Sequence, residues 1–409
     1  MDKFMQVDGA LTGIRVLDLS RILAGPSAAQ LLGDFGADVV KVERPGEGDD
    51  TRRWGPPYIQ DVNGAETDES AYYLCANRNK RSIAIDISTD VGQALVDKLI
   101  ARADVLVENY KVGGLTKYGL SYEQLRSRFP KLIYCSVTGF GQTGPYAHRS
   151  GYDFLIQGMG GIMQLTGEPD GQPMKVGVGI ADLMTGMYAA VGILAALQFR
   201  SKTGQGQHID ISLLDTQISW LANAGTNYLT SRELPERLGN GHPNIVPYQV
   251  FNTNDESMIV AVGNDSQFQR FCRVISAEGL AEDPRFASNP VRVRNRTELC
   301  ALIQQKLMTR GRDEWIACME DVNVPCGPVN NLRDVFNDGH VKARKAEIEI
   351  PCEWAKEGHV SVLANPLRMS LSPPTYRRPP PRLNEHQDEV LDDWLGDESI
   401  GEKNVRNYP

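Results

Sequence analysis

The chain has 409 residues, of which 41% are hydrophobic and 23% are charged, as is ordinary for a soluble globular protein. Its length predicts two or three domains. With 43 Lys and Arg residues against 52 Asp and Glu residues the net charge is −9, which argues against nucleic acid or an anionic membrane as the main partner. An acidic chain can still hold an anionic small ligand in one local basic cluster.

The seven cysteines are scattered, and no two of them form a C-x-x-C pair. We therefore expect a reducing compartment. Residues 1–9 show neither an apolar signal core nor an Arg-rich transit peptide, so the expected location is the cytoplasm, or the mitochondrial matrix if a transit peptide has been removed. The apolar run 184–199 is shorter than the roughly 20 residues of a bilayer span and predicts a buried helix, with no membrane partner.

Strand and helix patterns alternate in the first part of the chain. Apolar, β-branched runs predict strands over 14–19, 39–43, 82–87, 105–107 and 132–137, and helices are expected over 28–35, 91–103 and 122–128. This alternation predicts an α/β fold with a Rossmann-like parallel sheet, in which ligands bind beyond the carboxyl ends of the strands. No three-glycine fingerprint follows the first strand, which disfavours an NAD enzyme. A sheet that binds no nucleotide remains an alternative.

The second half of the chain changes character after a long helix expected over 181–200. Short strand-like runs at 249–252 and 258–262 are followed by helical stretches to about residue 321, and a last amphipathic helix is expected over 385–395. We expect the N-terminal part of a large domain over 1–205, a linker over 206–235, a small α+β domain over 236–322, and over 323–409 a linker and a return to the large domain.

Seven short motifs stand in the order found in the class III coenzyme A transferases, which the chain resembles from about residue 11 to residue 395. They are 13–18 (GIRVLD), 24–26 (AGP), 36–46 (GADVVKVERPG), 79–82 (NKRS), 107–110 (VENY), 139–145 (GFGQTGP) and 203–207 (TGQGQ). Within the family the chain is most similar to the succinyl-CoA–glutarate CoA-transferases, on the segments 53–57 (RWGPP), 242–249 (HPNIVPYQ) and 327–331 (GPVNN).

The resemblance implies a particular architecture and chemistry. The large domain is built from both termini, the small domain lies between them, and two subunits interlock as a homodimer. A coenzyme A thioester and a small carboxylic acid are the implied substrates, and no tightly bound cofactor is expected.

The resemblance assigns the catalytic nucleophile to Asp182, which stands at the start of the long helix. A carboxylate that attacks a thioester forms a mixed anhydride, which CoA thiolate reopens at the enzyme's own carbonyl. A helix N-terminus favours the charged form, so we expect Asp182 to be ionised near neutral pH. Read on local sequence alone, Asp182 is equally an ordinary N-cap residue.

Tyr152 stands where the racemase branch of the family carries a histidine that acts as an acid/base at the α-carbon. Tyrosine, with a reference pKa of about 10, is a poor base at neutral pH, so this residue favours transfer over racemisation. A packed aromatic role for Tyr152 is the alternative.

The resemblance also places residues against CoA. Arg44 matches an arginine next to the nucleotide, and further contacts correspond to Leu23, Ala24, Asn109, Tyr110, Lys117 and Tyr152. Leu23 replaces the glutamine of formyl-CoA transferase, and Lys117 replaces an arginine, which keeps the charge and loses the bidentate fork. Taken one at a time, exposed basic residues are also explained as solvated surface.

Several other positions have less certain roles. Arg52, Arg53 and Arg149 are candidates for holding the distal carboxylate of a dicarboxylic substrate. The segment 263–267 stands where formyl-CoA transferase has a glycine-rich lid, and it is equally a simple turn. His242 could shape the acyl pocket or belong to a structural loop, and His386 is expected to be structural. No second His or Cys stands at metal-ligand spacing, so no metal site is expected.

The leading hypothesis is CoA transfer between short dicarboxylic acids, with succinyl-CoA as donor and glutarate, itaconate or a similar acid as acceptor. The alternatives are a 2-methylacyl-CoA racemase, which the tyrosine at 152 opposes, and a catalytically silent CoA-binding protein, which the intact motif around Asp182 opposes.

Overall fold

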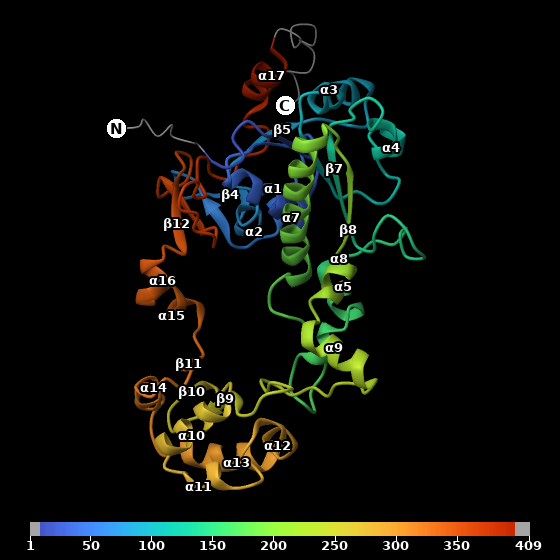
Figure 1. The fold of residues 1–409 in the computed structure, drawn as a ribbon. Helices are drawn as coiled ribbons and strands as arrows, with labels where there is room; N and C mark the ends of the chain where they lie inside the picture. The colour runs from blue at the N-terminus through green and yellow to red at the C-terminus, as the bar shows by residue number, and fades with distance from the viewer. Residues whose placement is uncertain (1–8, 397–409) are drawn as a thin grey trace, which may run out of the picture. The chain divides into compact units, whose positions relative to one another are not determined.

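A six-stranded parallel sheet forms the centre of the larger of two units into which the chain divides (Figure 1). The structure is a computed structural model and describes residues 9–396. The large unit contains residues up to 160, residues 176–220 and those from 342 onward, and the small unit contains residues 161–175 and 221–341.

The sheet of the large unit has the strand order β5-β2-β1-β6-β7-β8, and every neighbouring pair is parallel. Its strands are β1 (Arg15–Asp18), β2 (Asp38–Glu43), β5 (Lys80–Ala84), β6 (Val105–Glu108), β7 (Ile133–Thr138) and β8 (His208–Ser212). The five strands expected from the sequence are present. The order reverses between β1 and β6, and a crevice opens at such a reversal beyond the carboxyl ends of the strands.

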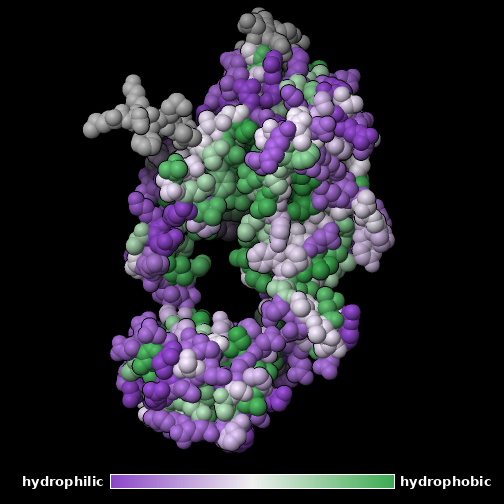
Figure 2. All heavy atoms as spheres, in the orientation of Figure 1, coloured by the Kyte–Doolittle hydropathy of each residue, from purple (hydrophilic) through white to green (hydrophobic). Residues whose placement is uncertain are grey.

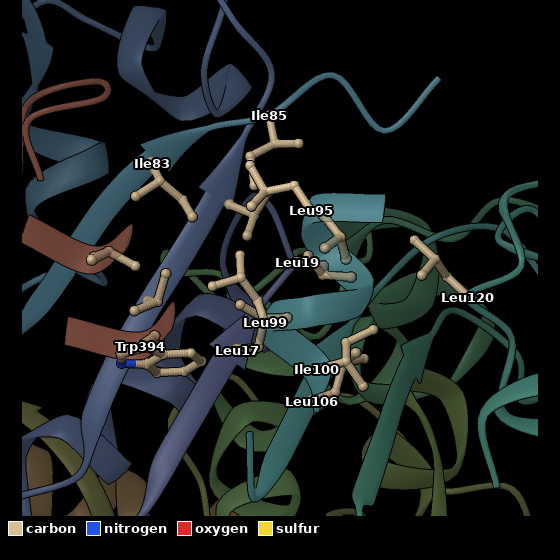
Figure 3. Packing of buried hydrophobic residues seen from close by; sticks show 14 of the residues in the cluster. Leu17, Leu19, Ile83, Ile85, Leu95, Leu99, Ile100, Leu106, Leu120 and Trp394 are labelled. Atoms are coloured by element: carbon tan, nitrogen blue, oxygen red, sulfur yellow. The ribbon is translucent and has the colours of Figure 1, made fainter. Parts of the chain in front are cut away.

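Helices cover both faces of this sheet. One face is covered by α1 (Ala24–Asp34) and α7 (Ile180–Thr203), the other by α3 (Asp90–Ile100), α4 (Tyr122–Leu125) and the C-terminal α17 (Gln387–Leu395). Figure 3 shows the second layer, where Leu17 of β1, Leu99 of α3 and Trp394 of α17 point toward one another. Because both faces are covered, β6 (VLVE) and β7 (IYCSVT) are mostly apolar, whereas β2 and β5 carry Lys41 and Lys80, which are buried as ion pairs.

The helix α7 is longer than the sequence indicated and only one of its faces is buried. Its 24 residues end at Gly204, which adopts φ 74° as a left-handed C-cap. By length and composition it is the one helix in the described part of the chain that could cross a membrane. It packs closely on α1, whereas Met187, Tyr188 and Val191 are exposed. The expectation of a buried helix therefore holds for one face of α7 only, and hydrophobic atoms lie on the visible face of the large unit around α1 and α7 (Figure 2).

The large unit has further small elements that the sequence did not indicate. Two antiparallel hairpins pair β3 (Tyr58–Gln60) with β4 (Glu66–Ser70) and β12 (Glu347–Pro351) with β13 (His359–Leu363). The remaining short elements are η1 (Asp50–Arg53), α2 (Ala71–Leu74), η2 (Thr116–Tyr118), α5 (Asp153–Met159) and α8 (Leu213–Ser219). The expected linker over 206–235 instead begins with β8, the sixth strand of the sheet, because His208–Ser212 pairs with β7.

The small unit has a three-stranded antiparallel sheet in the order β11-β10-β9, packed on helices around its own apolar core. Its strands are β9 (Tyr248–Asn252), β10 (Ser257–Ala261) and β11 (Cys326–Pro328). Its helices are α6 (Ile162–Leu165), α9 (Ala222–Ser231), α10 (Asp265–Val274), α11 (Gly279–Glu282), α12 (Asn289–Arg294), α13 (Arg296–Leu307), α14 (Arg312–Glu320) and α15 (Leu332–Asn337), and α16 (Gly339–Ala343) contains the boundary between the units.

Candidate active site

A pocket of about 420 Å³ lies at the carboxyl ends of β1, β6 and β7, where the strand order reverses. Every residue that lines it belongs to the large unit. The ionisable side chains of the lining are five basic residues and one carboxyl group, Asp182, besides the tyrosines; the basic residues are Arg21, Arg44, Lys111, Lys117 and Arg149. This excess of positive charge suits a ligand that carries several phosphates.

The eight residues that the resemblance assigns to the nucleophile and to CoA contacts all line this one pocket: Leu23, Ala24, Arg44, Asn109, Tyr110, Lys117, Tyr152 and Asp182. They come from positions up to 159 residues apart, and the sheet brings them together because parallel strands end at the same edge. The structure adds Arg21 and Lys111, which are next to predicted positions in the sequence and had no motif of their own.

Asp182 is the third residue of α7 and is only 8% exposed. The N-cap of this helix is Gly179, so the alternative explanation of Asp182 as the capping residue was wrong. Burial, and then the negative charge of Asp153, raise the pKa of Asp182 to about 7. The expectation of a fully ionised carboxylate at neutral pH was therefore also wrong, because desolvation opposes the effect of the helix end.

Asp153 is a residue that the sequence analysis missed. Its Oδ1 atom accepts a hydrogen bond of 2.8 Å from the backbone N–H of Ala181, and its Oδ2 atom accepts one of 2.7 Å from Nε2 of Gln157. It thereby satisfies one of the free N–H groups at the start of α7. In the sequence, the one indication that Asp153 could belong to the site was its place directly after Tyr152. Nothing near it in the chain indicated that it would contact the start of a helix 28 residues away.

Tyr72 is a second residue that the sequence analysis missed. Burial, and then the carboxylate of Asp182, raise the pKa of its hydroxyl to about 12. Its ring packs edge-on against Trp54 with centroids 5.2 Å apart. A neutral phenol therefore lies within electrostatic range of Asp182, and it keeps its proton at physiological pH.

The side-chain amide of Asn109, an expected CoA contact, is hydrogen-bonded to protein backbone. Its Oδ1 atom accepts from the backbone N–H of Arg21 at 2.9 Å, and its Nδ2 atom donates to the carbonyl of Arg21 at 2.6 Å. Asn109 thus joins the ends of β6 and β1 across the strand-order reversal. It lines the pocket with its amide already occupied by backbone.

The three candidate arginines for a distal carboxylate have distinct surroundings. Arg52 is buried and ion-paired with Glu43 at 2.7 Å and Glu69 at 2.5 Å, so its guanidinium is committed to the protein. Arg53 is exposed and donates to the carbonyl of Gly46 at 3.5 Å. Arg149 lines the same pocket as Asp182, and its guanidinium lies 4.6 Å from the centroid of the Tyr146 ring.

The remaining positions have structural partners. Nδ1 of His242, in the small unit, accepts from the backbone N–H of Asn244 at 3.0 Å. The backbone N–H of His386 donates to the carbonyl of Ser82 at 3.0 Å, which ties the start of α17 to β5. In the segment 263–267, the side chain of Asn264 caps α10 by accepting from the N–H of Gln267.

Two further features of the site are the surroundings of Arg44 and the distribution of possible metal ligands. Arg44 is exposed and pairs with Glu47 at 2.6 Å, and this hydrogen bond raises its pKa. Between residues 9 and 396 no cluster of three or more His, Cys, Asp and Glu side chains could hold a metal ion.

Comparisons with known proteins agree with the character of this pocket. The model of CoA-transferase family III matches residues 11–387. The chain is 50% identical over 382 residues to the succinate–glutarate CoA-transferase of Agrobacterium fabrum, covering 93% of this chain and 94% of that protein. It is 41% identical over 394 residues to the human succinyl-CoA:glutarate CoA-transferase, covering 96% of this chain and 88% of that one.

A crystal structure of a CaiB/BaiF family protein from Brucella suis has a TM-score of 0.83 to this chain, with 48% sequence identity. The similarity covers 95% of this chain and 100% of the other. A family match over most of the chain, two relatives above 40% identity and a shared fold lead to one conclusion: the chain belongs to CoA-transferase family III and is an enzyme of that class.

Proposed function

We propose that this enzyme moves CoA between short dicarboxylic acids, with succinyl-CoA as donor and glutarate, itaconate or a similar acid as acceptor. The observation that carries the proposal is the single carboxyl group, Asp182, in a pocket whose lining includes five basic side chains. The succinate or succinyl-CoA and glutarate named for the relatives from Agrobacterium fabrum and human support the choice of acids.

We assign the role of nucleophile to Asp182. Its carboxylate attacks the thioester carbonyl, the C–S bond breaks, and CoA leaves as a thiolate with a mixed anhydride left on Asp182. The thiolate then attacks the aspartyl carbonyl, which releases the first acid and leaves an aspartyl-CoA thioester. The acceptor carboxylate repeats the two steps in reverse. The nearly complete burial of Asp182 protects both intermediates from water.

Four of the five basic residues of the pocket are the proposed contacts of the CoA phosphates, namely Arg21, Arg44, Lys111 and Lys117, with Tyr110 beside them. We propose that Arg149 holds the distal carboxylate of the dicarboxylic acid. Two observations support this assignment. Arg52 is committed to internal ion pairs, and of the three candidate arginines only Arg149 lines the pocket with Asp182.

We also propose the interlocked homodimer. The exposed apolar side chains on α5 and α7 of the large unit support it, among them Phe154, Met187 and Val191. Sedimentation measurements on the purified enzyme test this part, and a monomer would contradict it.

Trapping of the covalent intermediate tests the mechanism. The enzyme is incubated with succinyl-CoA, treated with hydroxylamine or borohydride, and the modified peptides are mapped. We expect modification at Asp182, loss of that modification and of transfer in Asp182→Ala, and its retention in Arg53→Gln. A fully active Asp182→Ala enzyme would refute the assignment. Deuterium uptake at the α-carbon without acyl exchange would favour a racemase.

A further inference from the structure

The turn formed by residues 20–23, between β1 and α1, is held by side chains rather than by neighbouring backbone. Nζ of Lys41 donates to the carbonyl of Ser20 at 2.9 Å, and Oδ1 of Asp49 accepts from the N–H of Ile22 at 3.2 Å. Oδ1 of Asp18 accepts from the N–H of Ser20 at 2.9 Å. Together with Asn109, which holds both backbone groups of Arg21, these contacts bind the turn from β1, from β2, from the residue after β6 and from the loop before η1.

The turn contains a residue in an unfavourable backbone conformation. Ile22 has φ 74°, in the left-handed region, where a β-branched side chain crowds the backbone. Such a conformation persists only where the surroundings over-determine it, and it is concentrated at functional sites. Ile22 and its neighbours Arg21, Leu23 and Ala24 all line the proposed CoA pocket.

Lys41 and Asp49 form a completely buried ion pair. Nζ of Lys41 lies 2.9 Å from Oδ2 of Asp49, and neither side chain has any solvent exposure. Burial alone would raise the pKa of Asp49, but the charge of Lys41 and the hydrogen bonds of Thr51 lower it overall. A buried ion pair stabilises a fold less effectively than apolar packing does. Its presence here is better explained by a role in positioning the backbone.

We propose that the Lys41–Asp49 ion pair is a positioning device for CoA binding, which holds the turn 20–23 in the strained conformation that lines the pocket. Lys41 and Asp49 are positioning residues, because they act on the ligand through the backbone of Ser20 and Ile22. The inference rests on the proposed assignment of this pocket to CoA.

The test uses equilibrium binding of free CoA, which can be measured whether or not transfer occurs. We expect Asp49→Ala to raise the dissociation constant of CoA about tenfold, which corresponds to about 1.4 kcal/mol. Glycine adopts positive φ without strain, so the double variant Ile22→Gly with Asp49→Ala should regain most of the lost affinity. Asp49→Asn, alone and with Ile22→Gly, serves the same purpose if the alanine variant does not fold.

The matched control is Asp34→Asn, which breaks another buried pair, between Asp34 and Arg78 at 2.6 Å, on residues that do not line the pocket. It should lower the melting temperature and leave the dissociation constant of CoA unchanged. An Asp49 variant with wild-type affinity, or a loss of affinity that Ile22→Gly does not reverse, overturns the inference. If wild-type enzyme binds CoA but transfers none, the proposed function fails while this inference is still decided by affinity.

Discussion

The carboxylate of Asp153 accepts a 2.8 Å hydrogen bond from the backbone N–H of Ala181, the residue immediately before Asp182. One carboxylate is therefore anchored at the first turn of α7 next to the carboxyl group that is proposed to react. Like charges close together in a buried place cannot both ionise freely. The pair explains why the pKa of Asp182 is raised beyond the effect of burial alone.

Asp153→Asn should shift the pH dependence of transfer. The proposed nucleophile is the ionised form of Asp182, so kcat/KM in the wild-type enzyme should rise with pH through about 7. Asparagine keeps an oxygen for the N–H of Ala181 and removes the charge, so the pKa of Asp182 falls and the rise moves to lower pH. The measurement is a pH profile of kcat/KM for both enzymes. Superimposable profiles would contradict the coupling.

Asp182→Asn should stabilise the fold at alkaline pH. The folded-state pKa of Asp182, about 7, lies above its value of about 3.9 in an unfolded chain, so the folded state binds the proton more tightly. Stability is therefore lost as pH rises from about 4 to about 7. The variant lacks this loss, and its advantage should grow to at most about 4 kcal/mol at pH 8. Denaturant unfolding at pH 5 and pH 8 measures it, and an advantage independent of pH would disprove it.

Arg149→Gln should discriminate against dicarboxylic acids. Removing a charged partner of a carboxylate weakens binding by about ten- to hundredfold. We expect KM to rise by this factor for glutarate and to change little for a monocarboxylic acceptor of the same length. Arg53→Gln, which changes an exposed arginine outside the pocket lining, is the control. Equal losses for both kinds of acid would assign Arg149 to the CoA moiety instead.

Gly186→Ala and Gly192→Ala form a matched pair on α7. A Cβ at residue 186 would lie 2.7 Å from the carbonyl oxygen of Ala24 and 3.0 Å from Cβ of Ser27, whereas one at residue 192 meets Ile209 at an ordinary 3.4 Å. We expect the first variant to lose about 1–3 kcal/mol and to weaken CoA binding, because Ala24 lines the pocket. The second should gain up to about 1 kcal/mol from helix propensity. Equal thermal shifts would show that α1 and α7 do not pack this closely.

Local sequence patterns predicted five of the six strands of the parallel sheet, and the resemblance to the family supplied the residues that surround its reversal point. Strands such as β6 (VLVE) are buried along their whole length, and the alternation of such strands with helices permits few topologies. The hairpin β3–β4 escaped prediction because 66–70 (ETDES) is polar throughout and does not alternate in polarity. The strands β12 (EIEIP) and β13 (HVSVL) do alternate, and the sequence analysis overlooked them. Residues 206–212 were expected in a linker because β8 is only five residues long and half-buried.

The motifs of the sequence by themselves determined the family and the position of the proposed nucleophile, since both depend on residue types in a fixed order. Only the tertiary structure decided the state of that nucleophile. Desolvation and the charge of Asp153 depend on which groups lie close in space, and Asp153 is 29 positions away from Asp182 in the chain. For the same reason, the commitment of Arg52 to Glu43 and Glu69 and the hold of Lys41 and Asp49 on the turn 20–23 became visible only in the folded chain.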